Sequence, residues 1–351
     1  MAAGPSAAEF RSLIAAGVAA PSADNRHVVR FKPSGSALHL CVDAAAMSDL
    51  PHHRVSFHEM SFGAVIENIC IAAAASGFAV TVVPDDAWRT SGAVATVHFS
   101  ASPDMRAHPL ADAILARHTN RRLYSRRRIG DAILDEIAAS AEAHPGTRMR
   151  WLDDAASRRT ALTAIRLAES ERFRRRELHA ELFSSIRFDS GWKQSADEGL
   201  APGSLEVEPF LRGPFALLRR WPVQKALNAA GAASLLGLRA GWLPARSAPH
   251  LGVLLVDSDC QRPWLAAGRA LQRLWLTAAR NGVALQPMAA AIALVAQQAG
   301  SGWARQSVQA HLVDLIGSLA GERTAVMLVR AGYARSPSVV AGRQPLDAYL
   351  V

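Results

Sequence analysis

Cysteine and aromatic residues are scarce in this chain of 351 residues. The three cysteines, Cys41, Cys70 and Cys260, lie far apart and form no CxxC pair. This spacing argues against a disulfide framework, and we expect free thiols in a reducing, cytoplasmic compartment. Aromatic residues make up 6% of the chain and form no stripe that could stack on bases, so nucleic acid is not an expected partner.

Several motifs that define common enzyme classes are also missing. The chain contains no GxGxxG, GxxxxGK[ST] or GxSxG, so we expect neither a Rossmann nor a P-loop phosphate site. His52, His53 and His58 cluster without a cysteine or carboxylate at ligand spacing, and we predict no metal. No run of 18 apolar residues occurs, and the N-terminus has no basic segment before an apolar one. We therefore expect neither a membrane span nor a signal peptide.

Positive charge, in contrast, is abundant. The formal net charge is +9, and arginines gather in RRLYSRRR (121–128) and RFRRR (172–176). We interpret the second cluster as a solvated face. Guanidinium groups bind phosphate by paired hydrogen bonds, so the first cluster also suits a small phosphorylated ligand.

The hydrophobic pattern predicts an α+β chain. Expected helices cover 6–19, 57–76, 155–187 and 263–281, and expected strands cover 28–31, 37–42, 78–83, 94–99, 283–287 and 325–333. The helix over 57–76 is apolar on nearly every side, which indicates a buried helix. A glycine follows it at the position where helices commonly end.

Two helices of this set share a glycine spacing. Gly63 and Gly77 bracket one buried-looking helix, Gly268 and Gly282 bracket another, and a strand follows each. We interpret this as an internal repeat of two units, 1–105 and 106–351, with coincidence between two alanine-rich helices as the alternative. The second unit carries an insertion at about 190–250, which we expect to act as a lid.

Two short stretches could carry chemistry. Pro21-Ser22-x-x-Asn25 fits a plain turn, or a loop that presents short polar groups to a planar ligand. In RHTNRR, Arg117 and Arg121 would share a face if the stretch is helical. If Thr119-Asn120 interrupts the helix instead, arginines would gather near a new helix N-terminus. Either arrangement concentrates guanidinium groups suited to a phosphate monoester.

These stretches, together with Gly282-x-x-x-x-Pro287 and the terminal GY…R-x-P-L, resemble the nitroreductase family of FMN flavoproteins. The order of the motifs is most similar to the tandem, Acg-like branch, in which two nitroreductase-like halves are fused in one chain. The resemblance implies an intramolecular pseudo-dimer of two units with mixed sheets covered by helices. It also implies one FMN between the halves, where the Pro-Ser-x-x-Asn loop reaches across to the flavin. Because this interface is internal, we expect a monomer or a weak dimer.

The resemblance implies an oxidoreductase in which the flavin takes hydride from NAD(P)H and reduces a nitro compound, quinone or similar small-molecule acceptor. No side chain is assigned as catalytic. The alternative is a protein that binds and sequesters FMN under a closed lid. Relatives usually follow the loop asparagine with a Gln-Pro-Trp type sequence, whereas this chain has Arg26-His27-Val28, so we expect Arg26 or His27 near the ring. The alternative is that Arg26 is a solvent-facing turn residue. The expected cofactor-binding residues are Pro21, Ser22, Asn25, Arg26, Arg117, Arg121, Arg122, Gln286, Pro287 and Arg343.

Overall fold

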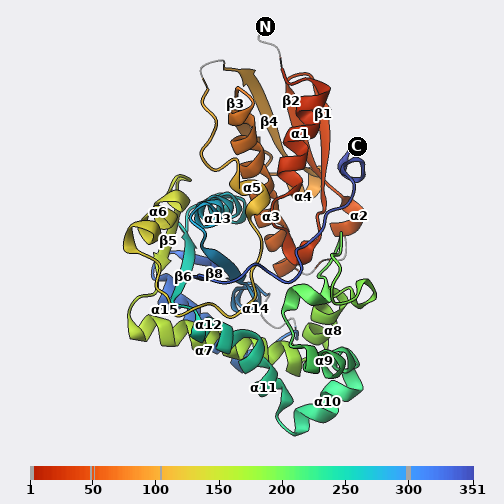
Figure 1. Ribbon diagram of the computed structural model, residues 1–351, viewed down its shortest axis with the longest axis vertical. Helices are drawn as coiled ribbons and strands as arrows, with labels where there is room; N and C mark the ends of the chain where they lie inside the picture. The colour runs from red at the N-terminus through yellow and green to blue at the C-terminus, as the bar shows by residue number, and fades with distance from the viewer. Residues whose placement is uncertain (1–3, 48–49, 51, 103–104, 298–301) are drawn as a thin grey trace.

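The computed structural model describes residues 4–47, 50, 52–102, 105–297 and 302–351 and contains two four-stranded sheets (Figure 1). The first has the order β1-β2-β4-β3, and the second has the order β5-β6-β8-β7, so the two orders correspond strand by strand. The strands are β1 (Val29–Ser34), β2 (Ala37–Val42), β3 (Phe78–Pro84), β4 (Ala93–Ala101), β5 (Thr147–Trp151), β6 (His250–Val256), β7 (Ala284–Met288) and β8 (Thr324–Gly332).

Neighbouring strands within each four-stranded sheet are antiparallel, so these strands by themselves do not form the expected mixed sheets. A parallel contact is added at the edge of the first sheet, where Leu350 bridges to Phe31 of β1. The connection between β2 and β3 contains a long helix, and these two strands do run in the same direction. They are not adjacent, however, because β4 lies between them and pairs antiparallel with both. β8 lies in the same way between β6 and β7. The register also shifts at corresponding places, Leu40/Cys41 in β2 and Leu254/Leu255 in β6.

The helices cover the sheets and fill the space between them. Those of the first part of the chain are α1 (Ala7–Val18), α2 (Ala44–Met47), α3 (His52–Ala75), α4 (Trp88–Ser91), α5 (Ala113–Ala116) and α6 (Asp131–Glu142). Those that follow are α7 (Ala155–Arg174), α8 (Arg176–Ser184), α9 (Arg212–Leu218), α10 (Trp221–Ala229), α11 (Ala232–Gly237), α12 (Leu243–Ser247), α13 (Pro263–Arg280), α14 (Ala290–Ala296) and α15 (Gln306–Ala320). No helix of the described ranges is both long and apolar enough to cross a membrane.

α3 and α13 pack against each other between the two sheets (Figure 1). The contact is close because Gly63 of α3 faces Gly268 of α13. A Cβ at Gly63 would lie 3.0 Å from the Gly268 Cα, and a Cβ at Gly268 would overlap the Met60 carbonyl oxygen. The glycines that the sequence spacing singled out therefore let two backbones approach.

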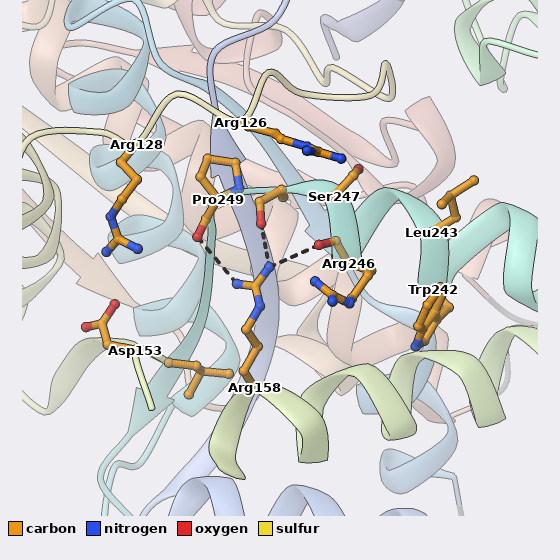
Figure 2. A pocket seen from close by; sticks show the side chains of 11 residues that line it. Arg126, Arg128, Asp153, Arg158, Trp242, Leu243, Arg246, Ser247 and Pro249 are labelled. Carbon is orange, nitrogen blue, oxygen red and sulfur yellow. Dashed lines mark hydrogen bonds between the residues drawn. The ribbon is translucent and has the colours of Figure 1, made fainter. Parts of the chain in front are cut away.

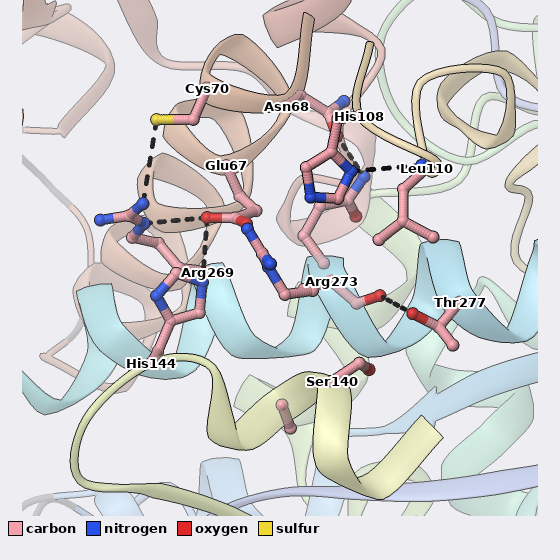
Figure 3. Close-up of polar contacts among 12 residues, drawn as sticks. Glu67, Asn68, Cys70, His108, Leu110, Ser140, His144, Arg269, Arg273 and Thr277 are labelled. Carbon is pink, nitrogen blue, oxygen red and sulfur yellow. Dashed lines mark hydrogen bonds and ion pairs between the residues drawn. The ribbon is translucent and has the colours of Figure 1, made fainter. Parts of the chain in front are cut away.

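A buried ionic network also joins α3 to α13 (Figure 3). The Glu67 carboxylate is fully buried and accepts from Arg269 Nε at 3.0 Å and Arg273 Nε at 2.6 Å. His144 Nε2, from the segment after α6, lies 2.9 Å from the same carboxylate. Burial raises the pKa of Glu67, but the His144 hydrogen bond and the nearby positive charges outweigh it and lower the pKa to about 2.

The region after residue 150 differs most from expectation. The helix expected over 155–187 is interrupted at Arg175, whose backbone is extended, so α7 and α8 are separate helices. The insertion between α8 and β6 contains α9 to α12, and β5 and β6 were not expected. The three cysteines are unpaired and half-buried.

The C-terminal segment returns from the second sheet to the first, as Figure 1 shows by the blue trace. Leu350 forms a parallel bridge with Phe31 of β1, and Tyr349 is buried there. Arg11 of α1 forms an ion pair with Asp347 at 2.7 Å. The last residues of the chain therefore complete the edge of a sheet that the first hundred residues build.

Candidate functional site

Two adjoining cavities lie where the two halves of the chain meet. The larger has a volume of about 300 Å³ and the smaller about 100 Å³. Their shared wall contains the Pro21-Ser22 loop, Asp24, Thr119, Arg121 and Leu200. α3 and β7 contribute further wall to the larger cavity, so residues from both halves surround one space.

The Pro21-Ser22 loop is held in an irregular conformation. Asp24 and Asn25 adopt left-handed backbone angles, with φ of 51° and 56°, which aspartate and asparagine tolerate better than most residues. The Ala23 N–H donates to Ser61 Oγ of α3 at 3.1 Å. Ser22 Oγ is buried and has no partner among the described residues. The loop therefore presents an unsatisfied hydroxyl at the cavity wall.

Asn25 joins three segments at the wall of the smaller cavity. Its Nδ2 donates to the Ala196 and Gly199 carbonyl oxygens, both at 3.1 Å. Its Oδ1 accepts from Arg343 Nη1 at 2.7 Å. Arg343 also donates to the Val18 carbonyl oxygen at 2.7 Å. Protein partners therefore occupy most of both side chains, which fix the loop in place, and burial lowers the pKa of Arg343.

Arg117 is a buried cation with unused donors. Its side chain is 5% exposed, and its Nε and Nη1 have no partner among the described residues. Its guanidinium carbon lies 4.4 Å from the centre of the Trp275 ring, and its Nη2 donates to the Ala19 carbonyl at 3.3 Å. Burial and the charge of Arg343 lower its pKa to about 9. A buried guanidinium without a carboxylate is costly unless an anion completes it.

Arg121 faces both cavities. Its one hydrogen bond within the described chain runs from Nη1 to the Ser204 carbonyl at 3.3 Å, and burial lowers its pKa. The segment 117–130 is irregular, so Arg117 and Arg121 share no helix face and no new helix begins before Asp131. Both expected helical geometries are therefore wrong, yet both side chains reach the smaller cavity.

Three expected residues lie elsewhere. Arg122 donates to the Ser336 carbonyl and to Ser338 Oγ, both at 2.7 Å, and lines neither cavity. Arg26 is half-exposed and lies 3.3 Å from Glu198. His27 packs edge-on against Tyr349, with ring centres 6.0 Å apart. The structure therefore does not bring Arg122, Arg26 or His27 to the cavities that the other expected residues share.

Gln286 and Pro287 of β7 line the larger cavity. The orientation of Gln286 depends on Arg330, which the sequence analysis missed. Arg330 is fully buried and donates to Gln286 Oε1 at 2.7 Å and to the Arg122 carbonyl at 2.8 Å. Its guanidinium carbon lies over the Tyr124 ring, 4.0 Å from the ring centre. Burial lowers the pKa of Arg330 to about 10. A lone arginine inside the apolar run AVMLVRAGY was the available indication.

A second polar group that the sequence analysis missed forms another wall of the larger cavity. Arg54 of α3 forms ion pairs with Asp24 and with Glu181 of α8. His53 Nε2 lies 3.1 Å from the same Glu181 carboxylate. Burial raises the pKa of Glu181, but the His53 hydrogen bond and the charge of Arg54 lower it to about 2. This network ties α8 to α3 and to the Pro21-Ser22 loop.

The arginines of 172–176 are not merely a solvated face. Arg172 lines the larger cavity and donates to Glu169 at 3.2 Å. Arg175 Nη2 donates to the Gly302 carbonyl at 2.6 Å. The expectation for this cluster is wrong because α7 turns one side toward the cavity.

Gln297, in the same cavity, has a buried amide with no partner among the described residues.

The geometry gives the combined space two chemically distinct ends. Met60, Ala64, Leu271 and Trp275 supply apolar wall in the larger cavity. Arg117, Arg121 and Arg343 line the smaller cavity with a single carboxylate, that of Asp24, and make it cationic. Within the described residues, no group of three or more histidine, cysteine or acidic side chains could hold a metal ion. The space is suited to an amphiphilic ligand with an anionic end.

Comparison with known proteins gives the following similarities. No family model matches the chain. An uncharacterised protein of Mycobacterium tuberculosis is 27% identical over 229 residues, which are 65% of this chain and 32% of the relative, so the match spans about a third of the relative's length.

Among solved structures, the FMN-dependent nitroreductase NfnB from Mycobacterium smegmatis, in complex with NADPH, is similar with a TM-score of 0.37 and 18% identity. This match covers 68% of the present chain and 96% of that one. A nitroreductase with bound FMN from Bacteroides fragilis has a TM-score of 0.35 and 13% identity, over 65% and 89% of the two chains. Both of these solved structures are of nitroreductases.

Proposed function

We propose that this chain is an FMN-dependent oxidoreductase of the nitroreductase type, with one flavin site between two tandem units. The observation that carries the proposal is the shared pair of cavities, to which the first unit contributes Pro21-Ser22 and the second contributes Arg117, Arg121 and Gln286-Pro287. These are motif residues that the sequence alone grouped together. They come from segments about a hundred residues or more apart in the chain.

The smaller cavity fits the phosphate of FMN. Arg117 has two buried nitrogen atoms without a protein partner, and Arg121 has a single hydrogen bond to a carbonyl. A phosphate dianion would complete both, and charge-assisted bonds from guanidinium to phosphate are strong. The Ser204 carbonyl and the loop around Val339 close the same cavity, so the phosphate would be largely shielded from water.

The larger cavity fits the flavin ring. Trp275 and Met60 offer apolar surface to a planar group, while Ser22 Oγ and the side chain of Gln286 supply polar contacts at its edges. Arg330 fixes one end of the Gln286 amide, which orients the other end. Bound FMN supplies the hydride chemistry, and the chain's own residues bind and orient it and exclude water. No acid or base side chain is needed for that role.

The electron donor is proposed to be NAD(P)H, and the acceptor a nitro compound, quinone or similar small molecule. The chain has no dinucleotide fingerprint, which fits a donor that visits the flavin face and leaves before the acceptor enters. Leu182 and Leu205 border the larger cavity on the side of the insertion. This apolar border favours flat, weakly polar acceptors.

The tandem arrangement is part of the proposal. The units are 1–105 and 106–351, and matching strand orders, matching register shifts and the Gly63–Gly268 contact support an intramolecular pseudo-dimer. The returning C-terminal segment binds the first sheet, as an exchanged arm would. Since the interface is internal, we propose that the protein is a monomer. We also propose that it acts in the cytoplasm.

A second candidate function is flavin sequestration. The observation that favours it is a set of hydrogen bonds between the insertion and the Pro21-Ser22 loop, in which Asn25 donates to the Ala196 and Gly199 carbonyl oxygens. Leu200 and Leu205 lie against the same cavities. A lid held in this way would retain FMN and exclude acceptors.

Anaerobic reduction separates the two functions. The protein is loaded with FMN, and its absorbance near the flavin maximum is followed after addition of NADH or NADPH. Bleaching within seconds supports the enzyme, and an unchanged yellow spectrum supports sequestration. If the protein retains no flavin after loading and desalting, both candidates are wrong.

A further inference from the structure

A second concave site is lined by Arg126 and Arg128, from the later part of the RRLYSRRR stretch, whereas Arg121 of that stretch lines the flavin cavities. We call it the basic groove; its volume is about 830 Å³, and none of its lining residues lines the flavin cavities (Figure 2). It is formed by the segment before α6, the start of α7, and α12 with the residues that follow it. The groove is lined by Arg126, Arg128, Leu152, Asp153, Arg158, Trp242, Leu243, Arg246, Ser247, Ala248 and Pro249.

The charge of the basic groove is unbalanced. Four arginines line it with a single carboxylate, that of Asp153. Arg126, Arg128 and Arg246 are exposed, and their guanidinium groups make no ion pair or hydrogen bond with any residue in the described ranges. Like charges gathered around one hollow repel one another, and an anion placed between them removes that repulsion.

Arg158 is held in position at the centre of this cluster. Its guanidinium donates to the Ala248 carbonyl at 2.5 Å, the Arg246 carbonyl at 3.3 Å and the Pro249 carbonyl at 3.4 Å (Figure 2). These contacts fix the side chain without neutralising its charge, because carbonyl oxygens carry no formal charge. Burial lowers the pKa of Arg158, and the charges of the nearby Arg246 and Arg128 lower it further. A fixed cation reduces the entropy lost when an anion binds.

The groove is too large for a single phosphate or chloride. Its volume lies in the range of sites for organic ligands, and Trp242 and Leu243 add an apolar side to the cationic one. Several guanidinium groups spread along one hollow suit an anion that carries several charges in a row. We propose that the basic groove binds an oligophosphate chain, either free or as part of a nucleotide, independently of the flavin site.

Calorimetric titration of the FMN-loaded protein with pyrophosphate and with ADP, at about 150 mM salt, tests this proposal. We expect saturable binding at one site per chain. Arg246→Gln should weaken it roughly tenfold, and Arg126→Gln combined with Arg246→Gln should weaken it further. Arg159→Gln is the matched control, because it removes the same charge from an exposed neighbour outside the groove and should change the affinity less than twofold.

The two probes distinguish the source of the phosphate chain. Tighter binding of ADP than of pyrophosphate would indicate a nucleotide whose base lies against the Trp242 side, and equal binding would indicate the phosphate chain alone. Three results would overturn the proposal: no saturable heat with either probe, equal losses in Arg246→Gln and Arg159→Gln, or a loss in Arg121→Ala with none in Arg246→Gln. The last would place the anion in the flavin phosphate cavity instead.

Discussion

Replacement of Arg121 by alanine tests how the proposed site holds the flavin phosphate. Arg121 faces both cavities, and its guanidinium makes one hydrogen bond in the described chain, to the Ser204 carbonyl. Most of its donors are therefore available to a ligand. Little of the fold depends on this side chain, so Arg121→Ala should leave the folded structure intact while it removes a phosphate contact.

The size of the effect follows from the type of bond. A hydrogen bond to a charged group contributes about 1.5–3 kcal/mol, which corresponds to a roughly ten- to hundredfold change in affinity. Burial at this position keeps the contact at the upper part of that range, because water competes weakly there. Arg117 remains in the variant and would still bind the phosphate, so FMN affinity should fall without being abolished.

Fluorescence titration with FMN and with riboflavin measures the effect. Riboflavin lacks the phosphate, so Arg121→Ala should change its affinity less than threefold. Arg122→Ala is the matched control, since Arg122 is the next residue, carries the same charge and points to Ser336 and Ser338 instead. Equal FMN binding by Arg121→Ala and the wild type, or equal losses of FMN and riboflavin, would refute the assignment of the smaller cavity to the phosphate.

Three further predictions concern the contact between the halves. Glu67→Gln should lower the free energy of unfolding by about 3–5 kcal/mol in urea titrations, because Arg269 and Arg273 lose a buried charged partner. Glu142→Gln, at an exposed ion pair, is the control, and a loss of unfolding free energy in Glu67→Gln that is smaller than the loss in Glu142→Gln would contradict the prediction. The pKa of Glu67 is about 2 in the folded state and roughly 4.3 in an unfolded chain. The stabilisation that the Glu67 carboxylate contributes is therefore present above about pH 4.3 and is lost as the pH falls toward 2. Over this pH range the free energy of unfolding should fall more for the wild type than for Glu67→Gln. Gly268→Ala should lower the melting temperature by several degrees because its methyl group meets the Met60 backbone, whereas Gly213→Ala, which meets nothing within 4 Å, should leave the temperature unchanged or raise it slightly.

The sequence predicted much of the first half because its elements are local and strongly patterned. α1, β1, β2 and α3 lie within a few residues of the expected ranges, and α1 begins at a capping box formed by Ser6 and Glu9. The shared spacing of Gly63–Gly77 and Gly268–Gly282 singled out two helices as equivalent, and in the structure these helices, α3 and α13, pack together. A glycine where another backbone approaches is visible in sequence, because no other residue fits there.

The second half was harder to predict because its strands are separated by long segments. β5 was not recognised, because arginine alternates in it with threonine, methionine and tryptophan. β6 was not recognised either, because it directly follows the insertion and its first residue could not be located. The antiparallel pairing could not be read from the order of elements. A helix between two strands suggests parallel neighbours, and only long-range pairing places β4 and β8 between them.

The site shows the same division. Pro21, Ser22, Arg117 and Arg121 belong to short motifs, and the structure brings them to adjoining cavities. One ionic network joins residues from three segments that are distant in the sequence, Asp24, His53 with Arg54, and Glu181. No local sequence pattern could therefore predict it. Arg26 was assigned from its neighbour in the motif, yet the turn at Asn25 directs it to Glu198.

Flavin stoichiometry tests the central claim most directly. The purified chain is saturated with FMN and desalted, and bound flavin is measured by absorbance against protein determined by amino-acid analysis, with the mass of the complex from light scattering. We predict one FMN per chain in a monomer, because each half supplies only part of one site. Two flavins per chain, none, or one flavin shared between two chains in an obligate dimer would contradict it.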